Sequence, residues 1–144
     1  MDQHAALATV KHYLYTTDRD AAHEIYHDDA VLEFPQSGER FEGVDNFKPW
    51  RVNYPAKVEF ELDRLRGRDD LWIAEVRSRY DGGPWNYGVT ILEFRGDKVA
   101  HETIYGGESW EAPEWRAPWR AAPPREQVGT EGSGPARETA VDGK

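Results

Sequence analysis

One short segment of the sequence matches a zinc-binding pattern. His23-Glu24-Ile25-Tyr26-His27 reads H-E-x-x-H, which on a helix places both imidazoles on one face, where they could share a zinc ion with Glu24 as the base. The surroundings argue against this interpretation, because Asp28-Asp29 and a strand-like run follow His27 at once. The longer metzincin motif would also need glycine at position 30 and histidine at position 33, where the chain has alanine and glutamate. A zinc hydrolase is therefore the less favoured alternative, and we predict no metal site.

A second pair of proton-transferring side chains, His101 and Glu102, lies on the last apolar run of the chain. Neighbouring residues of a strand point to opposite faces of a sheet, so only one of the two can face the interior. An imidazole titrates near neutral pH, and a carboxylate surrounded by aromatic groups is desolvated, which suits it to general acid or base chemistry. Either residue is thus a catalytic candidate, depending on the phase of the strand.

Aromatic residues are frequent, with six Trp, seven Tyr and five Phe. They offer wide, rigid apolar surface that could hold a flat or polycyclic ligand. The candidates for such stacking are Trp50, Trp72, Trp85 and Tyr87. The alternative is that several of them only fill the core.

The first half of the chain predicts helices. Leu7, Val10 and Leu14 give residues 3–16 a helical period, with Asp2 as the cap. Further helices are expected near residues 20–27 and 45–53. Between them, residues 30–34 form a short apolar strand that stops at a proline.

The second half changes to a period of two. Alternating apolar and polar residues predict strands over residues 58–63, 72–80, 85–95 and 99–108, and Asp- and Gly-rich turns separate the later ones. Four strands joined in this way make an antiparallel meander. The fold class is therefore α+β.

Composition excludes several partners. The net charge of −9 repels phosphate backbones and anionic lipid heads, so we predict neither nucleic acid nor a membrane as partner. No apolar run has the length of a membrane-spanning helix. The chain has no cysteine and shows no signal-peptide pattern, so we predict a cytoplasmic protein.

The C-terminal part divides into two pieces. Trp110, Trp115 and Trp119 are expected to lay residues 110–120 back on the body of the protein. Residues 123–144 are rich in Pro, Gly, Glu and Thr and cannot bury enough apolar area to offset their chain entropy. We therefore predict one domain over residues 1–122 and a disordered tail over residues 123–144.

The order of these elements resembles the nuclear transport factor 2-like superfamily, and within it the SnoaL-like branch. The residues that carry the resemblance are Asp28 to Pro35 after the second helix, Gln36 to Arg40 with Gly43 before the third, Gly96 to Val99, and Glu111 to Arg116. The resemblance covers roughly residues 3–120. Each piece is weak alone, but their order and spacing are fairly specific.

This resemblance implies a cone-shaped fold in which three N-terminal helices pack on a curved antiparallel sheet around a hydrophobic pocket. Superfamily members include ketosteroid isomerases, scytalone dehydratase, limonene epoxide hydrolase and polyketide cyclases. Most need no cofactor, and many are homodimers that pack sheet against sheet. The resemblance therefore implies a small apolar organic ligand, no cofactor and a homodimer, while the reaction stays open.

The resemblance also assigns candidate residues. Ketosteroid isomerases carry acids at the positions of Phe34 and Leu92, so that reaction is not expected, and both side chains become pocket wall. Glu102 and Ile104 should point into the cone and His101 outward, which makes Glu102 the first catalytic candidate and His101 the alternate. The candidates for assisting catalysis or lining the mouth of the cone are Tyr13, Gln36, Arg40 and Arg51. Arg51 could instead simply neutralise a buried Glu102.

Three functions follow as hypotheses. The first is a cofactor-independent enzyme that performs cyclisation, isomerisation, dehydration or epoxide opening by proton transfer at Glu102. The second is a module that binds a ligand without catalysis or serves only for dimerisation. The third is the zinc hydrolase.

Overall fold

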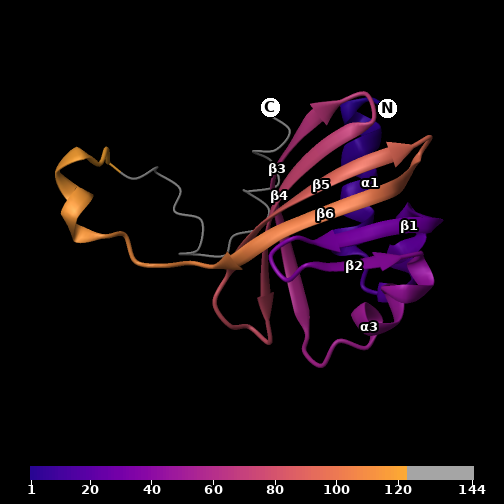
Figure 1. Ribbon diagram of the computed structural model, residues 1–144, viewed down its shortest axis with the longest axis horizontal. Coiled ribbons are helices and arrows are strands. Elements are labelled where there is room, and N and C mark those ends of the chain that lie inside the picture. Colours follow the sequence, from indigo (N-terminus) through magenta and orange to yellow (C-terminus); the bar gives the residue numbers. More distant parts are fainter. Residues whose placement is uncertain (123–144) are drawn as a thin grey trace.

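The computed structural model describes residues 1–122, arranged as helices against a curved six-stranded sheet (Figure 1). The predicted α+β fold is therefore confirmed. The proposed tail, residues 123–144, lies outside the described residues. Among the described residues, no helix has the length and apolar character needed to cross a bilayer.

The helices occupy the N-terminal third. Helix α1 spans Gln3–Tyr15, and the carboxylate of Asp2 caps it by accepting a hydrogen bond from the backbone N–H of Ala5 at 2.8 Å. Helix α2, Arg19–Ala22, begins at the Asp18 cap and continues as the 3-10 turn η1, His23–Ile25. A further 3-10 turn, η2 (Val44–Asn46), precedes helix α3, Lys48–Val52.

The sheet has the strand order β2-β1-β6-β5-β4-β3. Its strands are β1 Tyr26–Phe34, β2 Glu39–Glu42, β3 Val58–Arg68, β4 Leu71–Tyr80, β5 Asn86–Arg95 and β6 Lys98–Glu108. Strands β3 to β6 form the predicted antiparallel meander, and β1 joins it by pairing in parallel with β6. The last strand of the meander thus lies in the middle of the sheet.

Register shifts interrupt three strand pairings of this sheet, one of them between Tyr26 and Val31 in the pairing of β1 with β6. The pairing of β3 with β4 shifts between Leu62 and Arg64, and the backbone N–H of Leu62 donates to the Tyr15 hydroxyl of α1 at 2.8 Å. The pairing of β5 with β6 shifts between Glu93 and Phe94, and Ala100 is the extra residue on β6. Such bulges increase the local twist and re-aim the side chains that follow them.

The core lies between α1 and the concave side of the sheet. Side chains from both layers are fully buried there, and their burial is the main favourable contribution to folding. The central members of this core, all with no exposed surface, are Ala6, Ala30, Leu32, Phe47, Leu62, Leu65, Ala74 and Val99.

Three local predictions were wrong. The second helix ends at Ile25, and the strand expected from residue 30 begins at Tyr26, which pairs with Val99 of β6. Residues 40–43 were expected to lead directly into the third helix, but Glu39–Glu42 form strand β2, which pairs with β1. Gly43, at φ 93, then turns the chain into η2, a conformation that favours glycine.

The prediction that the C-terminal tryptophans lie on the body was also wrong. Strand β6 runs out from the sheet into a segment that ends in the 3-10 turn η3, Glu114–Trp119 (Figure 1). Trp110, Trp115 and Trp119 are 83%, 73% and 79% exposed. The chain leaves the sheet because β5 begins at Asn86, the partner of Glu108, so β6 has no neighbour to pair with beyond that point.

Candidate functional site

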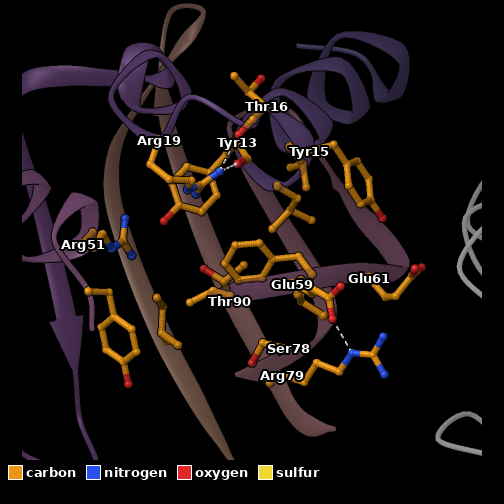
Figure 2. A pocket seen from close by; sticks show the side chains of 18 of the residues that line it. Tyr13, Tyr15, Thr16, Arg19, Arg51, Glu59, Glu61, Ser78, Arg79 and Thr90 are labelled. Atoms are coloured by element: carbon orange, nitrogen blue, oxygen red, sulfur yellow. Dashed lines mark hydrogen bonds and ion pairs between the residues drawn. The ribbon is translucent and has the colours of Figure 1, made fainter. Parts of the chain in front are cut away.

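A cavity of about 730 Å³ lies between α1, α3 and the concave side of the sheet. Its wall combines apolar side chains with a few polar groups, as in small-molecule sites. Figure 2 shows Tyr13, Arg51 and Thr90 around this space, and Glu59 with Arg79 at one side.

Glu102 stands in the wall of the cavity and is 5% exposed. Its two carboxylate oxygens have different partners. The Tyr26 hydroxyl donates to Oε1, and the Thr90 hydroxyl donates to Oε2 at 2.5 Å. A carboxylate accepting two such bonds is held in one orientation and keeps lone pairs free for a proton.

Arg51 provides the compensating charge. Its Nη1 donates to the Tyr26 hydroxyl oxygen at 2.9 Å, and its Nη2 lies 3.9 Å from Oε1 of Glu102. The second distance makes an ion pair but is too long for a hydrogen bond. The side chains of Arg51 and Glu102 are only 11% and 7% exposed, so each charge depends on the other for its stability.

The electrostatics keep the donors of this cluster protonated. Burial, above all, raises the pKa of Tyr26 well above its ordinary value, with a further contribution from Glu102, although Arg51 acts in the opposite direction. Burial disfavours the charge of Arg51, but Tyr13, Tyr26 and Glu102 outweigh it and raise the pKa of the guanidinium. Tyr26 is therefore a hydrogen-bond donor, and Arg51 is a permanent cation.

Tyr13 projects from α1 into the cavity and is held by two arginines. The guanidinium carbon of Arg19 lies 4.5 Å from the centroid of its ring, and that of Arg51 lies 5.2 Å away. Nη1 of Arg19 also donates to the carbonyl oxygens of Tyr13 and Thr16, at 2.7 and 2.9 Å, at the end of α1. These contacts fix the position of the tyrosine ring.

Most of the other predicted pocket residues line the cavity. They are Phe34, Trp50, Arg51, Trp85, Leu92 and Ile104. The ring of Trp85 is also covered by cations, because the guanidinium carbons of Arg77 and Arg79 lie 4.7 and 4.5 Å from its centroid. Its capacity to stack on a ligand is correspondingly reduced.

Four predicted residues lie elsewhere. Trp72 belongs to the core and donates from its indole nitrogen to the carbonyl oxygen of Asp69 at 3.0 Å. Gln36 and Tyr87 line a second groove, at the mouth of the cavity. Arg40 pairs with Glu33 and Glu42 at the surface.

His101 lies on the other face of the sheet from Glu102. Its Nε2 is 3.4 Å from Oε2 of Glu33, and its Nδ1 is 3.3 Å from Oε2 of Glu93. The bulge at Ala100 determines this arrangement, since Val99 and Glu102 both face inward although they are three residues apart. Simple alternation from the buried Val99 would have placed the imidazole inside.

Sequence reasoning did not identify two partners of Glu102. Tyr26 falls within the helix expected near residues 20–27, whereas in the structure it opens β1. Thr90 was not singled out, although it lies two residues before the pocket-facing Leu92 on the same strand. The period of two was therefore a usable signal for Thr90.

The H-E-x-x-H segment does not form a helical metal site. His23 belongs to η1 and His27 to β1, so no single helix carries both imidazoles. The ring nitrogens are bound to the backbone, His23 Nδ1 to the Arg19 oxygen at 2.7 Å and His27 Nε2 to the Arg95 oxygen at 2.5 Å. Within residues 1–122 no group of three His, Asp or Glu side chains could hold a metal ion. The zinc-hydrolase hypothesis is therefore withdrawn.

His23 instead forms part of the aromatic support behind the site. It is 5% exposed, and its ring centroid lies 5.3 Å from that of Tyr13 and 5.6 Å from that of Tyr26. Because Nδ1 donates to the Arg19 carbonyl, the buried Nε2 is unprotonated, and it has no partner among the described residues. Desolvation lowers the pKa of His23 to about 4.

This burial predicts a pH dependence of stability. Above pH 6.5 His23 is neutral in both folded and unfolded chains, whereas between pH 6.5 and about 4 only the unfolded chain binds the proton. The free energy of unfolding should therefore fall across this window, by about 3 kcal/mol at most. Urea unfolding of His23→Gln should show a flatter dependence than wild type. The exposed His4→Gln is the control, and equal slopes for wild type and His23→Gln would contradict the assignment.

The comparisons with known proteins agree with this fold. The family model described as a SnoaL-like domain matches residues 8–102. A nuclear transport factor 2-like protein of unknown function from Burkholderia xenovorans LB400 is 37% identical over 85% of this chain and 98% of that chain, with a TM-score of 0.75. No curated protein matches the chain.

Two further solved structures share the fold at lower identity. A candidate ketosteroid isomerase from Kribbella flavida DSM 17836 is 22% identical over 85% of this chain and 93% of that one, with a TM-score of 0.73. An epoxide hydrolase of LEH-like type from M. tuberculosis is 17% identical over 72% and 83%, with a TM-score of 0.59. These likenesses extend to the fold and not to the chemistry.

Proposed function

The chain belongs to the SnoaL-like family, and from this premise we propose that it is a cofactor-independent enzyme. Its substrate would be a small, largely apolar organic molecule, and Glu102 would take up and return a proton during the reaction. The observation that carries the proposal is the buried carboxylate in the cavity wall, with one oxygen bound to Tyr26 and the other to Thr90. A positioned acid or base of this kind contributes about 10²- to 10⁴-fold to rate. The reaction class is isomerisation, cyclisation, dehydration or epoxide opening.

In this proposal Glu102 acts first as the base. It takes a proton from a carbon of the ligand or from a water molecule and becomes a neutral acid, and it returns the proton to the product at the end of the cycle. Arg51 stabilises the ionised form of Glu102, and it also stabilises negative charge that develops on the ligand. Thr90 can rotate its hydroxyl and accept a hydrogen bond once the carboxyl is protonated. Tyr13 forms the adjoining wall and assists from α1.

A direct test uses a panel of cyclic ketones and epoxides in heavy water, with mass spectrometry as the readout. Proton abstraction from carbon appears as deuterium in a recovered ketone, and epoxide opening appears as a diol. We expect one class of probe to react faster with the protein than without it. If no probe reacts while the cavity still binds apolar molecules, the protein is a binding module.

The cavity itself can be tested without a substrate. Ser78 lines it, so Ser78→Phe should fill part of the space and weaken binding of the fluorescent apolar probe ANS by about tenfold or more. Asp97→Phe, at the exposed turn between β5 and β6 and outside the cavity lining, is the control and should leave the affinity unchanged. Equal affinities for wild type and both variants would show that the probe binds outside the cavity.

A non-catalytic role is the second candidate function, and the observation that favours it is the ion pair of Arg51 with Glu102. A carboxylate with two hydroxyl donors and a nearby cation is already well satisfied, as a purely structural group would be. In that case the cavity would bind a ligand without converting it, or the domain would serve for dimerisation.

We also propose a homodimer in the cytoplasm. The outer face of the sheet supports the dimer, since it exposes apolar side chains, among them Leu71, Ile73 and Tyr105, at 47%, 37% and 44%. Sedimentation velocity should give twice the 16.5 kDa mass of one chain. Cell fractionation tests the location, for which the cysteine-free composition is the support.

A further inference from the structure

The C-terminal segment of the described residues exposes three large aromatic side chains to solvent. We name residues 109–120 the aromatic arm. Its three tryptophans are each more than 70% exposed, whereas Trp72 and Trp85 in the domain are 3% and 8% exposed. Clustered exposed apolar groups of this size commonly mark a surface that another molecule covers.

The groove at the mouth of the cavity has a complementary character. This mouth groove, of about 700 Å³, is lined by Phe34, Phe41, Trp50, Tyr80, Tyr87 and Ile104 among others. Four of these side chains, Phe34, Trp50, Tyr80 and Ile104, also line the cavity that contains Glu102. Whatever occupies the mouth groove would therefore form part of the cavity wall.

The arm starts beside this groove but points away from it. Gly106 and Gly107 line the groove, and the arm begins two residues later. The Gln36 amide fixes Gly106 from both sides, donating to its carbonyl oxygen at 2.9 Å and accepting from its N–H at 2.7 Å. Figure 1 shows the chain continuing outward from this point, with η3 well clear of the sheet.

The arm is long enough to reach the mouth groove of a neighbouring molecule. Its extended part and its 3-10 turn together span about 30 Å, which exceeds the radius of gyration of about 14 Å expected for a domain of this size. Glu111 and Glu114 balance Arg116 and Arg120, so the arm is neutral and is not repelled by a chain of net charge −9. Three buried tryptophans on each of two arms would cover about 1,000 Å² or more, enough for a specific interface.

We propose that two copies of this chain exchange their aromatic arms, each arm lying in the mouth groove of the other copy and completing the wall of its cavity. This exchange is a second contact of the homodimer proposed above, separate from the exposed outer face of its sheet. The exchange itself does not depend on catalysis at Glu102. It predicts that ligand binding and dimerisation are coupled, because the same tryptophans serve both.

The experiment exploits the absence of cysteine from the sequence. One chain carries Arg116→Cys in the arm, and a second, distinguishable by a tag, carries Gly107→Cys, where an added side chain meets no atom within 4 Å. After mixing and treatment with a flexible bis-maleimide, we expect a cross-linked product that contains one chain of each kind. A chain with both cysteines that cross-links only to itself would show that the arm folds back, and absence of any cross-link would equally overturn the exchange.

The second measurement is sedimentation velocity on a full-length triple variant. It carries Trp110→Ala, Trp115→Ala and Trp119→Ala. Since all three side chains are exposed within one chain, the fold should survive, as circular dichroism can verify. We expect the dimer dissociation constant to rise about 100-fold or more. A wild-type monomer would refute both the homodimer and the exchange. A triple variant as dimeric as wild type would retain the homodimer and refute the exchange.

Discussion

Glu102→Gln is expected to reduce turnover by about 10²- to 10⁴-fold while leaving ligand affinity within about twofold of wild type. Glutamine keeps the size and shape of the side chain, so its carbonyl oxygen can still accept from Tyr26, and the Thr90 hydroxyl can rotate to accept from the amide. What the variant lacks is a group that binds and releases a proton. Turnover of the best probe from the heavy-water panel and its dissociation constant are the two measurements.

The control for this variant lies on the same strand. His101→Gln removes a titratable group on the opposite face of the sheet, beside Glu33 and Glu93, and should change neither turnover nor affinity. Loss of turnover and affinity in equal measure in Glu102→Gln would mean that the carboxylate only binds the ligand. Retention of turnover would remove Glu102 from the mechanism.

Arg51→Met is expected to destabilise the fold by about 3–5 kcal/mol, because it leaves the Glu102 carboxylate buried without a compensating cation. Methionine replaces the apolar stem of the arginine but not the guanidinium, whose carbon lies 5.2 and 5.3 Å from the ring centroids of Tyr13 and Phe47, so a smaller part of the loss comes from these contacts. The free energy of unfolding from urea titration is the measurement. Adding Glu102→Gln to Arg51→Met should recover most of the loss, since the buried charge is then gone as well.

The exposed pair of Arg95 with Asp29 supplies the matched control. Their side chains are 57% and 71% exposed, so solvent screens the pair and Arg95→Met should leave the free energy of unfolding nearly unchanged. If Arg51→Met were as mild as Arg95→Met, or if the second substitution gave no recovery, the two buried charges would not be coupled. The proposed electrostatic basis of the site would then fail.

Regular periodicity explains which parts of this fold the sequence could predict. The spacing of Leu7, Val10 and Leu14, three and then four residues, predicts α1 to within a residue, and the alternation in the second half predicts the meander. Strand β2 was not predicted, because four residues are too few to show a clear alternation of apolar and polar side chains. Its pairing with β1 also depends on the turn that joins the two strands. The end of the second helix was misplaced because Tyr26 suits either element until its pairing with Val99 is known.

The site was predictable in part, for similar reasons. The resemblance placed Glu102 and Ile104 on the inner face, and both line the cavity. Arg51 was a predicted neutralising partner of Glu102. The bond from Tyr26 depends on the parallel pairing of β1 with β6, across 76 positions of sequence, and no local pattern indicates it. Thr90 lies on the neighbouring strand β5, where alternation with Leu92 indicates an inward side chain. The exposure of the arm could not be predicted from the sequence, because three closely spaced tryptophans are more typical of a segment that packs on its own domain.

The extra residue in β6 has a consequence for how sites of this fold can change. Deleting Ala100 would restore an even pleat and leave both faces as they are, because Val99 and Glu102 would then be two positions apart and would still point the same way. Straightening the strand while keeping Ala100 would have the opposite effect, since pairing Ala100 with Glu93 would turn the imidazole of residue 101 into the chamber and the carboxylate of residue 102 towards solvent. One unpaired residue therefore decides which of two proton carriers the chamber receives.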